Sequence, residues 1–304
     1  MAVDPRDGRR RQRQPMNGTG ILVGYDGSPD AERARDWALD EAARSGQPMH
    51  LAYVFEWLTM AGWTGPGGGP SIWPDDSARR QAAELVRQAA QAATGPDLAV
   101  TGELYEGPPA PVLQELSARA SLLVLGTRGL GGFAGLLVGS TTASVAAHAH
   151  CPVVVVRGDA DRRARAGHVA VGVDGSESSL LALGFAVKQA AARRVALHVL
   201  RGWRPPPGQR PPSGPDSREV TRADRAELDD SLSQWRQAFP DVTISVEVAE
   251  GNPAELLVSA SRNAQLVVVG TRGRGGLAGM LLGSVSQQLL HHAHCPVAVV
   301  RERR

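Results

Sequence analysis

The chain alternates short, continuous runs of hydrophobic residues with longer segments in which hydrophobic residues recur at helical spacing. The runs at 121–125 and 151–156 have the length and branching of strands buried on both faces of a parallel sheet. In the first half the pattern predicts strands over 20–24, 49–55, 98–105, 121–125 and 151–156, and helices over 29–45, 76–94, 108–120 and 141–147. A helix between every pair of strands predicts a parallel, doubly wound α/β sheet with right-handed crossovers.

Residues at the segment ends support this reading. Ser28 followed by Pro29 is an N-cap with a residue pre-set for the first helical position, and Gly46 suits the end of the same helix. The stretches 57–74 and 203–216 are rich in Gly and Pro and have no periodic pattern, so we expect long loops there. Loops of that length are uncommon in compact domains unless they cover a site or an interface.

The whole pattern then occurs a second time. Gly126 recurs as Gly270, a difference of 144 (270 − 126), and Asp26 recurs as Asp174, a difference of 148 (174 − 26). Gly107 already recurs at the smaller offset, as Gly251 (251 − 107 = 144), so the four-residue change falls between the first strand and Gly107, and we expect it in the long loop. The chain of 304 residues is long enough for two domains of about 150 residues each. We predict a disordered, Arg-rich tail over 1–17, one domain over 18–157, a polar linker over 158–166 and a second domain over 167–304.

One strand of the second half indicates the strand order. Residues 242–248 alternate between apolar and polar, which is typical of a strand with one wet face at a sheet edge. An order that puts the third strand at the edge and the first beside the fourth is 3-2-1-4-5, and we assign each half to the doubly wound, flavodoxin-like or Rossmann-like class. We therefore predict a five-stranded parallel sheet in each half, with a crevice at the carboxyl ends of the first and fourth strands.

A glycine stretch follows the fourth strand in both halves. Gly126 and Gly129 are followed after nine residues by Gly139 and Ser140, and the second half has the same spacing from Gly270 to Ser284. Glycine permits positive φ and lets a ligand approach main-chain N–H groups. The segments after Ser140 and Ser284 are helix-like, and a helix that opens on a glycine turn presents N–H donors and its positive dipole end to a phosphate. We therefore hypothesise one nucleotide site in each half.

These residues resemble the ATP-binding branch of the universal stress protein family. The family motif is glycine, two residues, glycine, nine residues, glycine and then Ser or Thr, and both halves match it position for position. The first-strand Asp of the family has counterparts in Asp26 and Asp174. The likeness covers about residues 18–157 and 167–301, so the chain looks like a tandem member of this family.

The resemblance implies a set of ligand-binding residues. Adenine would lie near the second-strand and fourth-strand ends, and the triphosphate along the glycine stretch and the start of the next helix. The implied residues are Asp26, Val54, Leu125, Gly126, Arg128, Gly129, Gly139, Ser140 and Thr141 in the first half, and Asp174, Val199, Val269, Gly270, Arg272, Gly273, Gly283, Ser284 and Val285 in the second.

Each of these residues also has a simpler interpretation. The glycines can form a tight turn that binds nothing. Asp26 and Asp174 can be turn formers in Asp-Gly-Ser, which does not prevent them from contacting a ligand. Arg128, Arg272 and Arg274 can bind phosphate or be solvated, because arginine is the usual cation of this chain.

Composition narrows the choice of partners. The chain has 33 basic and 31 acidic residues, a net charge of +2, so we expect no specific nucleic-acid partner and no attraction to anionic membranes. No apolar segment reaches the ~18 residues of a membrane span, and two cysteines do not make a disulfide framework, so we expect a cytoplasmic protein. We predict that the His and Cys residues near 148–151 and 291–295 bind no metal and that the thiols are buried.

The sequence therefore favours a nucleotide-dependent stress-response or regulatory protein that binds ATP with Mg²⁺ and has no designated catalytic residue. Because the glycine stretches lack the lysine of a Walker P-loop, a motor or GTPase switch is disfavoured. The alternatives are a slow ATPase or nucleotidyl-transfer enzyme in the same crevice, a cyclic-nucleotide-binding protein and a partner-binding module with vestigial sites. The resemblance also implies that the two fifth strands pair within the chain, and we expect a homodimer with protein partners unknown.

Overall fold

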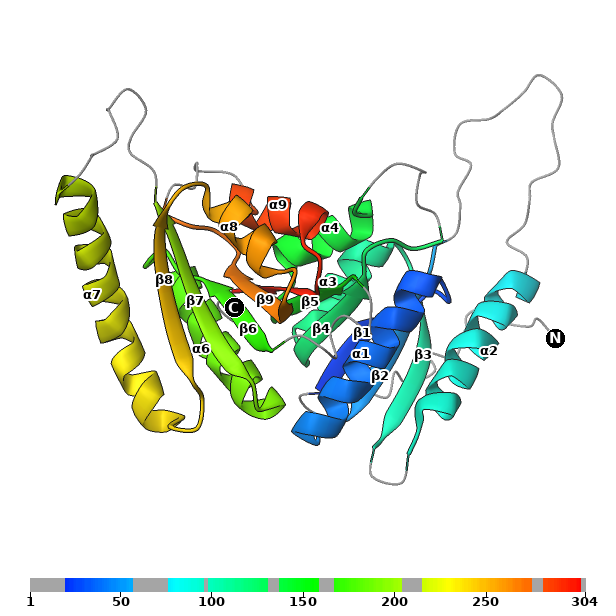
Figure 1. The fold of residues 1–304 in the computed structure, drawn as a ribbon. Helices are drawn as coiled ribbons and strands as arrows, with labels where there is room; N and C mark the ends of the chain where they lie inside the picture. Colours follow the sequence, from blue (N-terminus) through cyan, green and yellow to red (C-terminus); the bar gives the residue numbers. More distant parts are fainter. Residues whose placement is uncertain are drawn as a thin grey trace, which may run out of the picture.

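The structure, a computed structural model, describes residues 20–56, 76–95, 98–130, 137–158, 167–203, 215–274 and 281–301. It contains the predicted strand–helix alternation twice (Figure 1). The first half comprises β1 (Gly20–Gly24), α1 (Pro29–Ser45), β2 (Met49–Phe55), α2 (Asp76–Ala93), β3 (Val100–Glu106), α3 (Pro109–Ser117), β4 (Ala120–Gly126), α4 (Ser140–His148) and β5 (Val153–Val156). The second half comprises β6 (His168–Gly172), α6 (Glu177–Arg193), β7 (Ala196–Trp203), α7 (Pro215–Ala238), β8 (Ile244–Glu250), α8 (Pro253–Ala260), β9 (Ala264–Gly270), α9 (Ser284–His292) and β10 (Val297–Val300).

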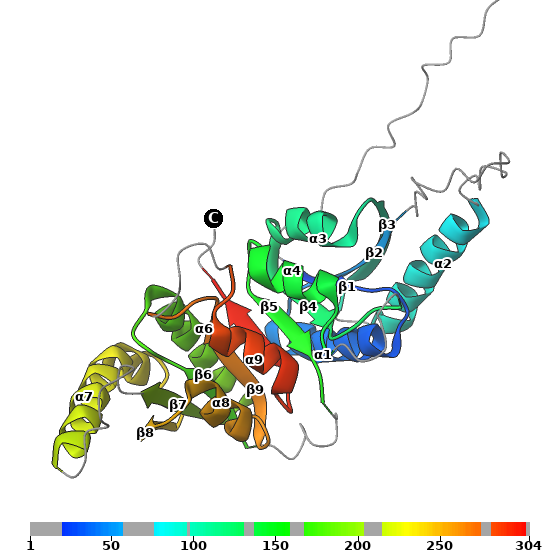
Figure 2. The same ribbon diagram turned by 90° about the horizontal axis from the view of Figure 1, so that it is seen from above.

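The two halves form one sheet. Its strands lie in the order β3-β2-β1-β4-β5-β10-β9-β6-β7-β8, so each half has the order 3-2-1-4-5 in its own strands. Within each half neighbouring strands are parallel, and only β5 and β10 pair antiparallel. The alternating strand β8 and its counterpart β3 lie at the two sheet edges, as the wet face of residues 242–248 predicts. Helices α2 and α7 accordingly lie at opposite ends of the molecule (Figure 2).

Local signals fix the ends of the first helix of each half. The Ser28 hydroxyl accepts the N–H of Ala31 at 3.2 Å, Pro29 begins α1, and Gly46 ends it in the left-handed conformation at φ 67°. Ser176 caps α6 in the same way through the N–H of Ser179. The contacts of Ser28 and Gly46 confirm the predicted caps of α1, and the turn between β1 and α1 follows the carboxyl end of β1.

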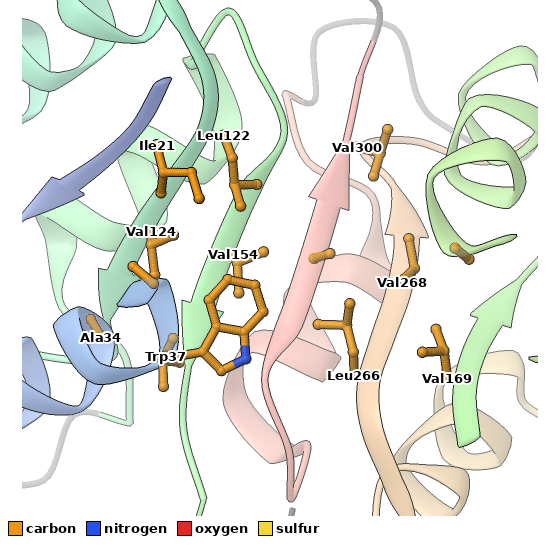
Figure 3. Close-up of a cluster of buried hydrophobic side chains, with 14 of the residues drawn as sticks. Ile21, Ala34, Trp37, Leu122, Val124, Val154, Val169, Leu266, Val268 and Val300 are labelled. Carbon is orange, nitrogen blue, oxygen red and sulfur yellow. The ribbon is translucent and has the colours of Figure 1, made fainter. Parts of the chain in front are cut away.

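Two layers of side chains fill the space between the sheet and its helices. One face packs against α1, α2, α6 and α7, and the other against α3, α4, α8 and α9. Figure 3 shows the first layer crossing from one half to the other, with Trp37 of α1 beside Val154 of β5. Because the central strands are buried on both faces, their sequences are continuous runs of Val, Leu and Ala.

Antiparallel pairing of β5 with β10 joins the halves, and arginines reinforce it. Val155, Val154 and Val153 pair with Val297, Ala298 and Val299. After β5, Arg157 donates to the carbonyls of Leu289 and Leu290, at 3.3 and 2.5 Å, near the end of α9. After β10, Arg301 donates to Ala149 O at 2.9 Å and to Ala147 O near the end of α4. Each half therefore satisfies the last carbonyls of a helix in the other half.

A buried ion pair connects α1 and α6 on the opposite face. The Arg193 guanidinium lies 2.8 Å from Glu41, and both side chains are nearly inaccessible to solvent. Gln189 donates to the other Glu41 oxygen at 2.8 Å, and Arg193 lies over the Trp37 ring. Burial lowers the pKa of Arg193, while the Glu41 charge opposes this shift. The pair is therefore maintained by hydrogen bonds that saturate the carboxylate.

Some expectations fall outside the described residues. The tail over 1–17, the loop over 57–74, most of the stretch 203–216 and the linker residues 159–166 belong to this group. Trp203 and Pro215, at the ends of the second predicted loop, belong to β7 and α7. Among the described helices, none combines the length and apolar character needed to span a bilayer.

We predict that Arg193→Ala lowers the free energy of unfolding by about 3 kcal/mol, because it leaves the Glu41 carboxylate buried without its main partner. Urea denaturation followed by circular dichroism measures this change. Arg236→Ala is the matched control, since Arg236 pairs with Asp229 on an exposed surface and its loss should cost less than about 1 kcal/mol. Equal effects of the two substitutions would contradict a special role for the buried pair.

Candidate functional site

Two cavities lie at the carboxyl ends of the strands, one where β1 meets β4 and, at the opposite edge of the sheet, one where β6 meets β9. Their volumes are about 370 and 780 Å³. The residues expected at a site, apart from Val199, line these two cavities. Those lining the first are Asp26, Val54, Leu125, Gly126, Arg128, Gly129, Gly139, Ser140 and Thr141, and those lining the second are Asp174, Val269, Gly270, Arg272, Gly273, Gly283, Ser284 and Val285.

The prediction for Val199 is wrong. Val199 is fully buried in the layer that packs against α6 and α7, on the side of the sheet away from the cavity. Its neighbour Leu200 lines the cavity instead, because successive side chains of a strand point to opposite faces. Strands β2 and β7 are related by the same 148-residue offset as β1 and β6. The counterpart of Val54 in the second half is therefore Gly202 (54 + 148). The offset changes to 144 only at β8, whose Ile244 corresponds to Val100 of β3 (244 − 100).

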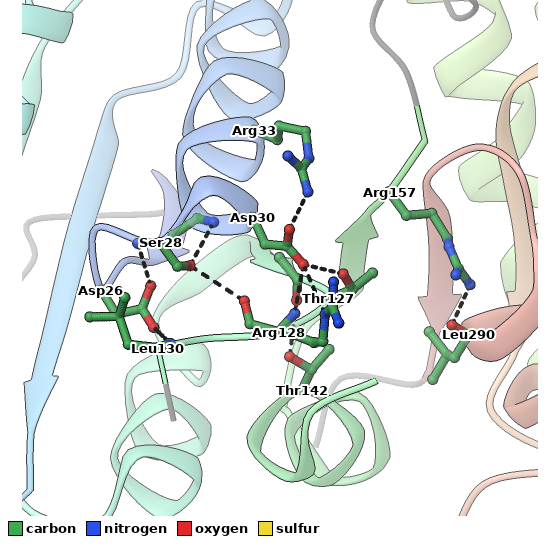
Figure 4. A network of polar contacts seen from close by, with 12 residues as sticks. Asp26, Ser28, Asp30, Arg33, Thr127, Arg128, Leu130, Thr142, Arg157 and Leu290 are labelled. Carbon is green, nitrogen blue, oxygen red and sulfur yellow. Dashed lines mark hydrogen bonds and ion pairs between the residues drawn. The ribbon is translucent and has the colours of Figure 1, made fainter. Parts of the chain in front are cut away.

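In the first half an aspartate fastens the glycine stretch to the first strand. One Asp26 oxygen accepts the N–H of Ser28 at 3.0 Å, and the other accepts the N–H of Leu130 at 2.8 Å (Figure 4). Asp26 is therefore the turn former that the sequence suggested, and it also positions the segment after β4. Both carboxylate oxygens have backbone donors before any ligand is considered.

Asp174 has the same role in the second half. It accepts the N–H and the hydroxyl of Ser176, at 3.0 and 2.6 Å, and the N–H of Arg274 at 2.8 Å. Burial acts to raise the pKa of Asp174, but the hydrogen bonds from Ser176 and Arg274 outweigh it and lower the pKa below its usual value. Asp174 is thus held as a carboxylate that anchors the second glycine stretch.

The motif glycines provide space rather than unusual backbone angles. A Cβ atom at Gly129 would overlap the Asp26 carboxylate, and one at Gly273 would overlap that of Asp174. Among the described residues, the left-handed glycines include Gly27 and Gly175, which are not in the glycine stretches. The described motif glycines therefore do not use the positive φ that glycine permits, and what they provide is room for close approach of the backbone.

The helices α4 and α9 begin at the cavities with open N-termini. Their N-cap residues are Gly139 and Gly283, and no side chain caps either helix. The N–H groups of Gly139 and Gly283 donate to the carbonyls of Thr127 and Thr271, at 2.8 and 2.7 Å, which closes the loop onto the strand end. The first N–H groups of each helix therefore face the cavity together with the hydroxyl of Ser140 or Ser284.

The other end of each cavity is apolar. In the first half it is formed by Val54, Leu125, Pro109 and Leu113, beneath the start of α3. In the second half the corresponding surface is formed by Leu200, Trp203, Val269, Pro253, Leu256 and Leu257, beneath the start of α8. Each cavity thus offers an apolar wall at one end and backbone N–H donors at the other.

A network of ion pairs distinguishes the second cavity and was not anticipated from the sequence. Arg201 of β7 is buried and pairs with Asp224 and Glu227 of α7, at 2.9 and 3.0 Å. Glu227 also pairs with Arg274 at 2.6 Å, so it connects the second strand to the glycine stretch. In the first half the positions of Arg201 and Arg274 are occupied by Tyr53 (201 − 148) and Leu130 (274 − 144). An alignment of β7 with β2 at the 148-residue offset would have shown from the sequence that Arg201 replaces Tyr53.

The His and Cys residues near 148–151 and 291–295 have structural roles at the ends of α4 and α9. Cys151 and Cys295 are buried, as predicted. His148 and His292 lie in the last turns of α4 and α9, where a histidine suits the negative end of the helix dipole. Within the described ranges, no group of three or more His, Cys, Asp or Glu residues is arranged to hold a metal ion.

Comparison with known proteins agrees with the internal repeat. The sequence model of the Universal stress protein family matches residues 19–157 and 166–301. A universal stress protein of Mycobacterium tuberculosis is 38% identical over 296 residues, which cover 95% of this chain and 99% of the relative. One from Mycolicibacterium smegmatis is 37% identical over 288 residues, covering 93% and 97% of the two chains. The crystal structure of a universal stress protein from Archaeoglobus fulgidus has a TM-score of 0.69 at 20% identity, covers 93% and 96% of the two chains, and supports the fold.

We predict that Asp174→Asn destabilises the protein by about 1–2 kcal/mol at pH 7, because the new NH₂ group faces an N–H donor. Since the folded-state pKa of Asp174 is lowered, its contribution is complete above its unfolded pKa of about 3.9 and is lost as the pH falls through the folded pKa. Thermal unfolding from pH 7 to pH 2 should therefore show the two proteins converging at the acid end. A constant gap across this range would contradict the role given to the charge.

Proposed function

We propose, because the chain belongs to the universal stress protein family, that each half binds one molecule of ATP at the carboxyl ends of its own parallel strands. Occupancy of the two sites would serve as the signal of a stress-response or regulatory protein. The observation that carries the proposal is the uncapped start of α4 and of α9 at a cavity whose glycine stretch is anchored by an aspartate. This arrangement occurs in both halves.

The phosphates would bind at the helix N-termini. Backbone N–H groups and the positive dipole end attract an anion, and the hydroxyls of Ser140 and Ser284 add a donor to each set. Gly129 and Gly273 lie where a side chain would displace the anchoring aspartate, so the backbone can approach the ligand only if these residues remain glycine. Arg128 and Arg272 line the cavities and can supply charge-assisted hydrogen bonds.

The adenine would occupy the apolar end. A planar base suits the space between the strand ends and the start of α3 or α8, where Pro109 and Leu113, or Pro253 and Leu257, form the wall. Mg²⁺ would be held mainly by phosphate oxygens, because Asp26 and Asp174 already use their oxygens to accept backbone N–H groups. Mg²⁺ commonly binds in this way, with few protein ligands and several waters.

Binding can regulate the protein only if ATP binds one conformation or assembly more tightly than another. The proposed sites are lined by the described parts of the glycine stretches and by the ends of the first strands, and the shared sheet connects the two sites. A homodimer would have to use other surfaces than the β5 and β10 edges, since these edges pair within the chain. Light scattering with and without ATP tests whether assembly depends on the ligand.

The alternatives are separated by simple measurements. A slow ATPase or nucleotidyl-transfer enzyme would turn over ATP above background, and this turnover would disappear in the double variant Gly129→Val, Gly273→Val. A cyclic-nucleotide-binding protein would bind cyclic AMP in preference to ATP. A partner-binding module with vestigial sites would neither release nucleotide on denaturation nor take up millimolar ATP.

We expect about two ATP per chain by titration calorimetry or by mass spectrometry of the nucleotide released on denaturation. Gly129→Ala and Gly273→Ala should each remove one site by weakening its affinity more than 10-fold, because the new methyl group displaces the anchoring carboxylate. The double variant should bind none. A stoichiometry that stays at two in both single variants would disprove the assignment of the sites.

The matched control is Gly167→Ala. A Cβ atom at Gly167 has no neighbouring atom within 4 Å, and its backbone is not left-handed. This substitution should leave both the number of sites and the affinity unchanged. Circular dichroism of all four variants checks that a lost site does not reflect a lost fold.

We further expect Glu227→Gln to strengthen ATP binding in the second half by roughly two- to five-fold at low ionic strength, because Glu227 partly neutralises Arg201 and Arg274. The gain should shrink in high salt, since the side chains of Glu227 and Arg274 are exposed to solvent. Calorimetry in the Gly129→Ala background isolates the second site. Glu106→Gln, which breaks the exposed pair with Arg79, is the control; an equal gain in this control would show that only net charge matters.

A further inference from the structure

The two halves carry different residues at one position beside their glycine stretches, Asp30 in the first half and Ser178 in the second. In the first half the buried carboxylate of Asp30 accepts the N–H of Arg128 at 3.0 Å and the hydroxyl of Thr127, and its other oxygen pairs with Arg33. Figure 4 shows these donors converging on Asp30 from α1 and from the end of β4. Arg128 Nε lies 3.9 Å from the same carboxylate. This part of the first half is thus a small anion site that a side chain of the protein already occupies.

The second half retains the donors and lacks the carboxylate. Thr271 and Arg272 correspond to Thr127 and Arg128 (127 + 144 and 128 + 144), whereas Ser178 stands in place of Asp30 (30 + 148). Ser178 does not replace the acceptor, because its hydroxyl donates to the Arg272 carbonyl. Thr271 is only 7% exposed. In the part of the chain that the structure describes, neither its hydroxyl nor the Arg272 N–H forms a hydrogen bond.

A cavity of about 380 Å³ opens at this position, between the two halves. Thr271, Arg272 and Ser178 line it from the second half, and His148 and His150 line it from the end of α4 in the first half. Arg301, which donates to the last carbonyls of α4, also lines this interdomain pocket. The acidic residue in the lining is Glu177, which is exposed. The pocket therefore has an excess of positive charge where the first half has a carboxylate.

We propose that the interdomain pocket binds a small oxyanion, a phosphate group in the first instance, which takes the place of the missing carboxylate. The anion accepts the Thr271 hydroxyl and the Arg272 N–H, as Asp30 accepts the equivalent groups of the first half. Arg301 supplies further positive charge from the end of β10, and His148 and His150 add imidazole nitrogens from the other half. The pocket is larger than inorganic phosphate alone requires, so it also has room for the organic part of a phosphate monoester.

This site is separate from the proposed ATP sites. Its lining, among the described residues, includes none of those that form the apolar walls at α3 and α8, and it combines residues of both halves. It adjoins the second cavity, since Arg272 and Gly273 line both. A bound oxyanion would connect α4 of the first half to the glycine stretch of the second.

The test compares wild type with Ser178→Asp, which rebuilds the arrangement of Asp30. Thermal unfolding is measured in increasing inorganic phosphate at constant ionic strength, with chloride as the counter-titrant. Wild type should gain about 2–4 °C with a saturable dependence on phosphate. Ser178→Asp should be more stable than wild type without phosphate and should lose this part of the response. Phosphate that enters the ATP cavities affects both proteins alike, so the difference between them reports on the interdomain pocket.

Two control variants separate the pocket from general charge effects. Ser178→Ala removes the hydroxyl without adding charge and should keep the phosphate response. Ser233→Asp adds the same charge on an exposed face of α7 and should also keep it. Methyl phosphate in place of inorganic phosphate distinguishes the two sources of the ligand, since an equal or larger shift shows that the pocket accepts a monoester.

A crystal soaked in selenate gives a second readout that does not depend on the stability of any variant. Anomalous scattering should place selenium within hydrogen-bond distance of the Thr271 hydroxyl and the Arg272 N–H. An identical phosphate response in wild type and Ser178→Asp, or the absence of selenium from the interdomain pocket at saturating selenate, would overturn the proposal.

Discussion

The antiparallel pairing of β5 with β10 is the contact on which the arrangement of the whole molecule depends. Each half alone would end in an exposed strand of Val and Ala residues, which is an edge that proteins must cover. Pairing the two edges buries both strands on two faces, directs the carboxyl ends of the two sets of strands to opposite edges of the sheet and brings α1 against α6. The Glu41–Arg193 pair and the helix ends bound by Arg157 and Arg301 then fix the halves relative to each other. The interdomain pocket exists because of this pairing.

Within each half, one aspartate organises the candidate site. Asp26 and Asp174 lie at the end of the first strand, and each receives N–H groups from its own turn and from the segment after the fourth strand. The carboxylate therefore holds together two segments that are about 100 residues apart in the chain. This contact also requires glycine at positions 129 and 273, because a larger residue would occupy the space of the carboxylate. The spacing of the motif thus follows from packing around the aspartate as well as from the needs of a phosphate.

The two halves share this arrangement and differ in the charged residues around it. In the first half Asp30 fills the space behind the glycine stretch, and the cavity itself is bordered by Tyr53 and Leu130. In the second half an ion-pair network from α7 reaches Arg274, and the space behind the stretch is open to the other half. Because the chain contains two copies of the site, the residues around one copy can differ while the other copy keeps its contacts. The two cavities are consequently different chemical environments on one scaffold.

The sequence by itself determined the elements, the repeat and the glycine motif, because strands, helices and caps depend on residues within a few positions of one another. Hydrophobic period, the Ser28–Pro29 cap and Gly46 sufficed for α1, and the alternation at 242–248 sufficed to place β8 at an edge. Only the tertiary structure decided that Val199 faces α6 and α7, that Glu227 reaches Arg274, and that the anchoring aspartates occupy the space above Gly129 and Gly273. These contacts join residues tens to a hundred positions apart, so they depend on strand register and helix packing, which local patterns do not encode.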